Sequence, residues 1–341
     1  MTSTIRHWRQ AGTGRGSLSF VTAPKPIPYA GEVLVKVKAV SLNYRDKLVL
    51  EGGVGLAPQE PIVPATDFAG IVEDVGDGVT VFRRGDRVVS TIAADWFDGA
   101  VPTPGLPLAP GFRSPAMPGA LCEYVIRPAY ALARSPDSLD DTETSTLPIA
   151  ALTAWFALIE RGRLRPGDSV LIHGTGGVAL FGLQFAKLAG AMAVVVSSSA
   201  DKLAAARQLG ADHLLLRGTP DLAAEVRRLT GGRGADHVLE TIGGSNFALS
   251  LDAAAPGGRV SLIGQISGTD LGGNGLHLAR KRLVVEGIAV GHRRAYDEML
   301  HAINVARLKP VIDSRFPLAD LPAALDRLDA GPFGKIVIDV A

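Results

Sequence analysis

The chain has 341 residues, of which 47% are apolar and 20% are charged, and its formal net charge is +1. This composition is typical of a globular protein, and the length favours two domains, each with its own core. Because basic residues are not in surplus, electrostatics gives no reason to expect nucleic acid or an anionic membrane as a partner. The N-terminus lacks the apolar core of a signal peptide and all apolar runs are short, so we expect a cytoplasmic protein.

The one cysteine, Cys122, excludes an intrachain disulfide and a cysteine-rich structural zinc site. It lies in the alternating segment 120–126, which is typical of a half-buried strand. We therefore interpret Cys122 as a small apolar packing residue.

Up to about residue 130 the sequence predicts strands and turns. Segment 32–40 alternates between valines and lysines, as an antiparallel strand with one wet face would. Three further strands are predicted at 68–75, 87–91 and 120–126, separated by Gly-rich turns, and together they indicate a small, partly open β-barrel.

Segment 93–119 contains six prolines and is predicted to be a surface excursion without regular structure. A loop of this length in a compact domain is usually functional or mobile. Its aromatic residues Trp96, Phe97 and Phe112 are candidate walls of an apolar substrate pocket. Contact with a partner subunit is the alternative.

From about Leu139 helices alternate with apolar strands, which predicts a doubly wound parallel sheet. A helix over 144–160, interrupted at Pro148, is predicted before the first strand of this sheet. Segment 283–290 would supply its last strand, and an exposed edge there makes a homodimer plausible. The remaining predicted helices are 201–209, 221–229, 246–254, 295–306 and 318–328, and the remaining predicted strands are 213–216, 237–240, 259–263 and 335–340.

Residues 169–199 predict a strand, a tight turn, a helix and a second strand. The turn fits the dinucleotide fingerprint in its small-residue form: Gly174 permits the turn, Gly176 lets the backbone approach a pyrophosphate, and Ala179 lets the helix lie close to the strand. The free N–H groups of the helix start would bind the phosphates, and a plain structural turn is the alternative. The candidate contacts are Gly174, Thr175, Gly176, Gly177 and Val178.

The end of the second strand favours NADP(H) over NAD. An NAD-selective site usually has an acidic residue there, whereas this chain has Ser197, Ser198 and Ser199 followed by Lys202. Hydroxyl groups and an ammonium group suit a 2′-phosphate. Alternatively, the serines only cap the next helix, or Asp201 accepts hydrogen bonds from the ribose.

Further cofactor contacts are expected where the parallel strands end. Thr241 and Ile242 should flank the adenosine, and two later strand ends should flank the nicotinamide. Lys335 is a candidate for a cofactor phosphate, with a solvated lysine at a strand edge as the alternative. The nicotinamide candidates are Ile263, Gly264, Gln265, Ala289 and Val290.

Several motifs in this order resemble the medium-chain dehydrogenase/reductase superfamily along nearly the whole chain. They are Ser41-Leu42-Asn43-Tyr44-Arg45-Asp46, Asp67-Phe68-Ala69-Gly70-Ile71-Val72 with Gly76, Arg84-Gly85-Asp86-Arg87-Val88, Leu152-Thr153-Ala154-Trp155, the fingerprint, Leu209-Gly210-Ala211-Asp212 and Gly334-Lys335-Ile336-Val337. The resemblance implies an α/β protein with a GroES-like barrel domain (1–150 and 292–341), an inserted Rossmann domain (151–291) and an active site in the cleft between them.

The departures from the resemblance concern the metal. Zinc alcohol dehydrogenases of the superfamily have Cys and His where this chain has Asn43 and Thr66, and a second Cys near the position of Ile149. These residues cannot replace two thiolates and an imidazole around Zn²⁺. The chain instead resembles the zinc-free quinone-oxidoreductase and enoyl-reductase branch, so we expect no metal.

The expected reaction is reduction by NADPH of an activated C=C bond or a quinone, because conjugation disperses the charge that a metal would otherwise stabilise. The resemblance places Asn43 and Tyr44 under the nicotinamide as hydrogen-bond donors, and Thr153 near its phosphate. The alternatives are a helix cap for Asn43, barrel packing for Tyr44 and a bond to its own helix for Thr153. A metal-free alcohol or ketone dehydrogenase and a catalytically silent NADPH-binding protein are the rival functions.

Overall fold

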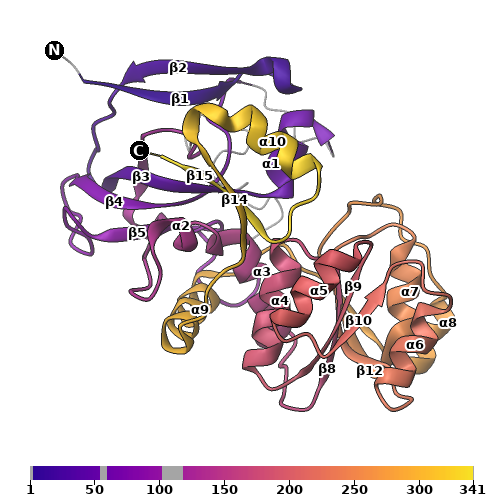
Figure 1. Ribbon diagram of the computed structural model, residues 1–341. Helices are drawn as coiled ribbons and strands as arrows, with labels where there is room; N and C mark the ends of the chain where they lie inside the picture. The colour runs from indigo at the N-terminus through magenta and orange to yellow at the C-terminus, as the bar shows by residue number, and fades with distance from the viewer. Residues whose placement is uncertain (1–2, 54–59, 102–117, 341) are drawn as a thin grey trace. The chain divides into compact units, whose positions relative to one another are not determined.

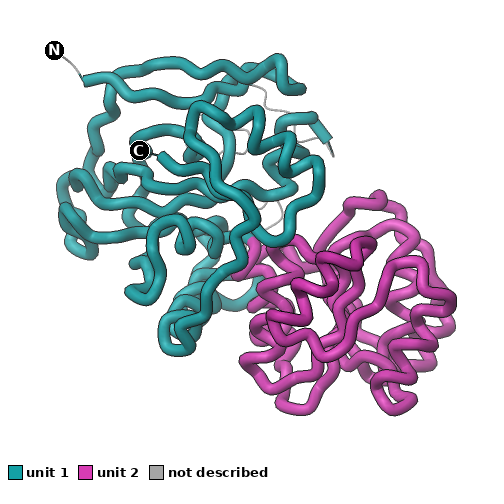
Figure 2. Tube along the Cα trace, viewed as in Figure 1, with its two compact units in different colours: residues 1–149, 292–341 teal, residues 150–291 magenta. Residues whose placement is uncertain are grey.

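A computed structural model describes residues 3–53, 60–101 and 118–340 of the chain. The chain divides into two compact units, residues 1–149 with 292–341 (unit 1) and residues 150–291 (unit 2), which are coloured separately in Figure 2. Among the described residues, no helix is both long and apolar enough to cross a membrane.

Unit 1 is built around strand β3 (Glu32–Leu42), whose alternating valines Val33, Val35 and Val37 are completely buried. The strand order of its larger sheet is β14-β15-β3-β4-β5-β7, and β6 also pairs with β3. The remaining strands are β1 (Thr4–Gln10), β2 (Leu18–Pro24), β4 (Asp67–Val75), β5 (Arg87–Ser90), β6 (Tyr124–Pro128), β7 (Leu132–Arg134), β14 (Ile312–Pro317) and β15 (Lys335–Asp339).

The C-terminal strands complete this sheet. Strand β15 pairs antiparallel with β3, with Ile336 opposite Leu42, and Figure 1 shows the yellow C-terminal strand beside the indigo one. Cys122 is buried in the core, as predicted. The helices of unit 1 are α1 (Tyr44–Glu51), α2 (Asp141–Thr144), α9 (Arg293–Ala306) and α10 (Leu321–Asp329).

Unit 2 contains a six-stranded sheet in the order β10-β9-β8-β11-β12-β13, and every neighbouring pair is parallel. The doubly wound sheet predicted from the sequence is therefore confirmed. Figure 1 shows α4 and α5 on one side of it and α6, α7 and α8 on the other. The strands are β8 (Ser169–His173), β9 (Met192–Ser197), β10 (His213–Leu216), β11 (Ala235–Glu240), β12 (Ala254–Leu262) and β13 (Val284–Gly287).

The helical segment near Pro148 differs from the prediction. Instead of one helix over 144–160, α2 ends at Thr144, a π-helical turn covers Leu147–Ala151, and α3 (Leu152–Trp155) leads into a second π-helical turn, Phe156–Glu160. Proline lacks the N–H that a regular α-helical turn needs, which explains the break. The remaining helices are α4 (Gly177–Leu188), α5 (Ala200–Gln208), α6 (Leu222–Leu229), α7 (Asn246–Ala253) and α8 (Gly275–Lys281).

Candidate functional site

The turn after β8 has the backbone that the fingerprint requires. Gly174 has a φ of +87°, which favours glycine, and Gly176 caps α4 with no protein atom within 4 Å of the place where a Cβ would lie. The chain itself does not use that space, so a phosphate could approach the backbone there. Ala179 is buried, which lets α4 lie close to the sheet. Thr175, Gly177 and Val178 complete the helix start. The residues present therefore fit a dinucleotide.

The loops at the ends of β11 and β12 are in close contact. A Cβ on Gly264 would lie 1.8 Å from the backbone oxygen of Thr241, so only glycine fits. Thr241 Oγ1 donates to the backbone oxygen of His173, 2.5 Å away, which ties this loop to the fingerprint strand. The predicted contacts Thr241, Ile242, Ile263, Gly264 and Gln265 thus follow neighbouring strands at one edge of the sheet.

A buried polar network beneath this edge was not predicted. Glu240 is fully buried, and its carboxylate accepts from the N–H groups of Ile242 (2.8 Å) and Gly243 (3.0 Å), from Asn246 Nδ2 (2.7 Å) and from the Ser250 hydroxyl. The carboxylate oxygens of Glu240 thereby fix the loop that carries Thr241 and Ile242.

His173, the last residue of β8, belongs to the same network. Its Nε2 lies 3.1 Å from Ser250 Oγ. Because the Ser250 hydroxyl donates to Glu240, its oxygen accepts from His173, which places the imidazole proton on Nε2. Burial lowers the pKa of His173, so the ring is neutral around pH 7.

At the end of β9 the capping interpretation is confirmed for one serine. Ser199 caps α5 by accepting from the Lys202 N–H at 3.3 Å, and the helix starts at Ala200. Ser197 is buried and accepts from the Ser199 N–H, whereas Ser198 is exposed. Capping leaves an exposed hydroxyl and a helix N-terminus at the predicted 2′-phosphate position.

Arg217 is a candidate that the sequence analysis missed. It directly follows β10, and its N–H donates to the backbone oxygen of Ser197 at 2.7 Å. Its charge also contributes to lowering the pKa of His173, after the larger effect of burial. The signal was available, because a cation at the end of the strand beside β9 reaches the same edge of a parallel sheet.

Three other cofactor candidates are placed as follows. Thr153 is buried in α3. Ala289 is exposed beyond the end of β13, and Val290 has a φ of +65°, a conformation that a β-branched residue rarely adopts. Such strain is concentrated at functional sites, so Val290 keeps its place among the candidates.

In unit 1 the side chain of Asn43 is engaged at both ends. Its Nδ2 donates to Asp67 at 2.9 Å, and its Oδ1 accepts from Lys335 Nζ at 2.5 Å. Its backbone N–H also donates to the carboxylate of Asp46 at 2.8 Å, so Asn43 starts α1, as the capping alternative holds. Lys335 is buried and also donates to the Leu42 oxygen at 2.7 Å. The interpretation of Lys335 as a solvated edge lysine is therefore wrong: its ammonium group points into unit 1.

Three residues at or near the positions that the resemblance compares with zinc ligands donate hydrogen bonds to one carboxylate. Asn43 Nδ2, Thr66 Oγ1 and the Ile149 N–H all donate to Asp67, over 2.9, 3.1 and 3.1 Å. Arg45 in turn donates to Thr66 Oγ1 at 2.9 Å. Hydrogen-bond donors around an anion are the opposite of a metal-ligand set, so these residues do not fit a zinc ion. Among the described residues, no group of three His, Cys, Asp or Glu side chains could hold a metal.

Burial controls the ionisation of these charged groups. It raises the pKa of Asp46 to about 6 and also raises that of Asp67, against the opposing attraction of Arg45 for Asp46 and of Lys335 for Asp67. Burial likewise lowers the pKa of Lys335, which Asp67 and Asp46 counteract. The charges of Lys335 and Asp67 therefore depend on each other.

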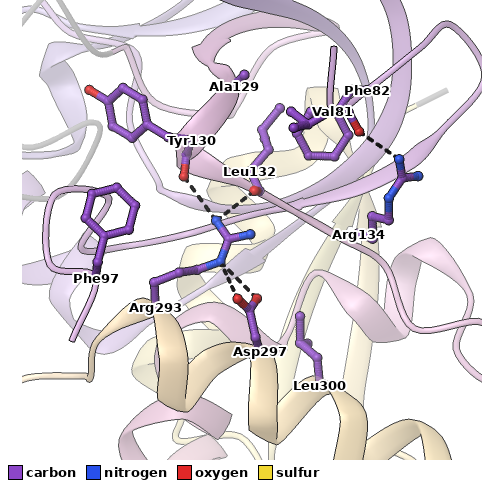
Figure 3. Close-up of a pocket in the computed structure, with 10 residues that line it drawn as sticks. All are labelled: Val81, Phe82, Phe97, Ala129, Tyr130, Leu132, Arg134, Arg293, Asp297 and Leu300. Atoms are coloured by element: carbon purple, nitrogen blue, oxygen red, sulfur yellow. Dashed lines mark hydrogen bonds and ion pairs between the residues drawn. The ribbon is translucent and has the colours of Figure 1, made fainter. Parts of the chain in front are cut away.

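Tyr44, the first residue of α1, is 39% exposed, so it does not pack in the barrel core. Trp96 is buried and donates from Nε1 to the Gly99 oxygen at 3.2 Å. Phe97 is 56% exposed and lines a hollow in unit 1 that is shown in Figure 3. Phe112 lies outside the described residues.

Comparison with known proteins agrees with this geometry. Residues 29–137 match the family described as "Alcohol dehydrogenase GroES-like domain", and residues 177–304 match "Zinc-binding dehydrogenase". A solved protein from Sinorhizobium meliloti 1021, provisionally named an alcohol dehydrogenase, is 49% identical with a TM-score of 0.94, and the match covers 99% of both chains.

Two further relatives are more distant. Human quinone oxidoreductase is 25% identical over 92% of this chain and 90% of its own. A mycobacterial protein solved with NADPH is 27% identical, with a TM-score of 0.82, over 98% of this chain and 99% of its own. The chain belongs to the medium-chain dehydrogenase/reductase superfamily, as a GroES-like barrel unit with a Rossmann unit. It is an oxidoreductase of this superfamily.

Proposed function

We propose that the protein is a zinc-independent reductase that transfers hydride from NADPH to an activated C=C bond or to a quinone. The observation that carries this proposal is the convergence of Asn43, Thr66 and Ile149 on Asp67 as hydrogen-bond donors. Without a Lewis acid, a substrate whose conjugation disperses negative charge is the easier one to reduce. Human quinone oxidoreductase, whose name describes such a reaction, is similar along the chain.

The deciding experiment is a screen for NADPH oxidation with a chelator present, against enones, enoyl thioesters, quinones and ketones. Turnover of enones or quinones supports the proposal. Oxidation of secondary alcohols with NADP⁺ in metal-free buffer would instead indicate an alcohol dehydrogenase, as the relative from Sinorhizobium meliloti is named. Tight NADPH binding with no turnover would indicate a silent binding protein.

We propose NADP(H) as the cofactor because Ser198, Lys202 and Arg217 supply hydroxyl and cationic groups in the segments that follow β9 and β10, where the 2′-phosphate is predicted, and because one similar protein was solved with NADPH. The nicotinamide, when bound, supplies the hydride. The pyrophosphate would lie against Gly174, Thr175, Gly176, Gly177 and Val178. The other contacts are those predicted from the sequence except Lys335, whose buried ammonium group is bonded to Leu42 and Asn43 in unit 1.

Replacing Arg217 or Lys202 by alanine is expected to weaken NADPH about tenfold and to change NADH affinity less than about twofold, because only NADPH carries the extra phosphate. Titration of each variant with both cofactors measures this. Arg207→Ala, which removes an exposed cation from the other end of α5, is the control. Equal losses for NADPH and NADH would remove these residues from the phosphate site.

For proton transfer we propose Tyr44 as the donor to the substrate oxygen. Of the two candidates, Tyr44 is exposed whereas Asn43 is buried. Asn43 acts through its position: with Nδ2 on Asp67 and Oδ1 on Lys335, it fixes the turn from which Tyr44 projects. Trp96, Phe97 and Phe112 stay candidates for the substrate pocket, although the hollow beside Phe97 contains neither Asn43 nor Tyr44.

Tyr44→Phe is expected to lower kcat about 10²-fold and to leave NADPH affinity unchanged, since it removes only the phenolic proton. Steady-state kinetics with the best substrate from the screen measures this, and Tyr29→Phe, at another exposed tyrosine, is the matched control. An unchanged kcat would exclude Tyr44 as the donor.

We also propose a homodimer formed through the edge strand β13. Val284 on this strand is exposed, as are Leu276 and Leu278 on the preceding helix α8, so apolar groups surround an unpaired strand edge. Val284→Lys is expected to convert the dimer into a monomer, as measured by light scattering during gel filtration. A dimer that survives the substitution would contradict this interface.

A further inference from the structure

A hollow of about 600 Å³ lies on unit 1, and of the residues assigned above only Phe97 lines it. Four segments form it: the loop with Val81 and Phe82, the loop with Phe97, the segment 129–134, and one face of helix α9. Figure 3 shows their side chains around a common space. Its volume is in the range of small-molecule sites. None of the predicted catalytic or cofactor residues lines it.

Two arginines hold the walls of this hollow together. Arg293, the first residue of α9, donates from Nη1 to the oxygens of Tyr130 (3.0 Å) and Leu132 (2.9 Å) and from Nε to both oxygens of Asp297 (2.9 Å). Arg134 donates to the Val81 oxygen at 2.7 Å and lies over the Phe82 ring, 5.5 Å from its centre. Hydrogen bonds between its walls thus form the hollow in the absence of a ligand.

The aromatic wall is fixed as well. The backbone oxygen of Phe97 accepts from the Arg294 N–H at 3.0 Å, which ties its loop to the start of α9. The Phe97 and Tyr130 rings lie 6.4 Å apart at 52° to each other, and both remain about half exposed. Two neighbouring, exposed aromatic rings beside buried Leu132 and Leu300 offer a surface on which a flat apolar molecule could pack.

One donor in the hollow is left over. In the part of the chain that the structure describes, the Nη2 group of Arg293 has no acceptor, although Nη1 and Nε are both occupied. Figure 3 shows this nitrogen directed into the space bounded by Leu132, Arg134 and Leu300. A guanidinium held on two sides is a preorganised donor for an acceptor oxygen.

The charges select a neutral ligand. Arg293 is paired with Asp297, and Arg134 with Asp86, so the two cations are locally compensated. A carboxylate ligand would meet the exposed Asp297 beside the free donor, and a cationic ligand would meet two guanidinium groups. An uncharged carbonyl oxygen accepts from Nη2 without either repulsion.

We propose that this hollow is a second binding site for uncharged aromatic carbonyl compounds. The rings of the ligand pack against Phe97 and Tyr130, and its carbonyl oxygen accepts from Arg293 Nη2. The site shares Phe97 with the predicted substrate pocket, but it contains neither Asn43 nor Tyr44 and needs no cofactor, so it does not depend on the proposed function.

The test is isothermal titration of the full chain without cofactor, using 2-acetonaphthone, naphthalene and 2-naphthoate as probes. 2-Acetonaphthone is expected to bind about tenfold tighter than naphthalene, which lacks the acceptor, and tighter than the anionic naphthoate. Asp297→Asn should improve naphthoate binding about fivefold, because it removes the repelling charge. Asp297 is more than half exposed, so this variant is expected to fold.

Phe97→Ala should weaken 2-acetonaphthone about five- to tenfold, whereas Val305→Ala, at an exposed position of α9 outside the hollow, and Tyr44→Phe should change nothing. Melting curves check that each variant is folded. The proposal is overturned if no probe binds, if ketone and hydrocarbon bind equally, or if Tyr44→Phe rather than Phe97→Ala abolishes binding. The NADPH screen is read separately, so its failure does not affect this outcome.

Discussion

Replacing Lys335 by methionine is expected to lower the free energy of unfolding by about 3–5 kcal/mol, the cost of removing a buried cation that is hydrogen-bonded and that attracts the buried carboxylate of Asp67. The ammonium group is buried and donates to Leu42 and Asn43. Of the neighbouring cations, it lowers the pKa of Asp67 most. Methionine fills a similar volume but leaves an uncompensated carboxylate and two carbonyl oxygens without donors. Denaturant unfolding at pH 7.5 measures the loss.

A matched substitution separates this effect from a general effect of losing a lysine. Lys309 forms a surface ion pair with Glu143 and its side chain is 56% exposed, so Lys309→Met should cost less than about 1 kcal/mol. If both variants lose a similar free energy of unfolding, the buried ammonium group of Lys335 stabilises the barrel no more than a surface lysine does.

The loss at Lys335 should also depend on pH. Burial raises the pKa of Asp46 from 3.8 to about 6 and that of Asp67 in the same direction, so the folded state holds protons that the unfolded state releases between pH 4 and 6. Stability from these groups therefore falls as the pH rises through that window. Without Lys335 their pKa values rise further, so the variant should lose more stability at pH 7.5 than at pH 5. An equal loss at both values would contradict this electrostatic account.

The parts of the protein predicted from the sequence are those with local causes. The β8–α4–β9 unit is read from a short apolar run, a Gly-rich turn and an amphipathic helix, all within about 30 consecutive residues, and the structure has each of them. The alternating valines of β3 likewise identify a strand, although Leu34, Val40 and Leu42 on its other face are buried as well. The hydrophobic periodicity of a segment depends only on neighbouring residues, so it predicts the helix or strand without knowledge of the rest of the fold.

The contacts that the sequence analysis missed join distant positions. Lys335 and Asn43 are 292 residues apart, and nothing near either residue indicates that they touch. The hairpin of β1 with β2 also lacks a strong alternating pattern, because its burial alternates irregularly. The Glu240 network required the register of β8, β11 and α7 to be known, which periodicity does not supply.

Glu240→Leu is expected to lower the free energy of unfolding by about 4 kcal/mol and NADPH affinity by at least tenfold. All four groups around the carboxylate donate hydrogen bonds: the N–H groups of Ile242 and Gly243, the Asn246 amide and the Ser250 hydroxyl. Leucine accepts none of these bonds, and each buried donor left unpaired costs about 1–3 kcal/mol before relaxation. The loop that begins at Thr241 would lose its anchor to the sheet.

A series of variants at this network separates volume from hydrogen bonding. Glu240→Gln keeps the shape but turns one accepting oxygen into a donor, so about half of the loss is expected, and Ser250→Ala should cost about 1–2 kcal/mol by freeing His173 Nε2 and one carboxylate oxygen. Hydrogen exchange at the Ile242 and Gly243 amides gives a direct readout, since both N–H groups lose protection only if the carboxylate holds them. If Glu240→Leu leaves their protection and NADPH binding unchanged, the loop is held by its backbone contacts with Gly264 alone. If the Glu240 carboxylate fixes the loop that begins at Thr241, the loss of stability should be largest for Glu240→Leu, smaller for Glu240→Gln and smallest for Ser250→Ala.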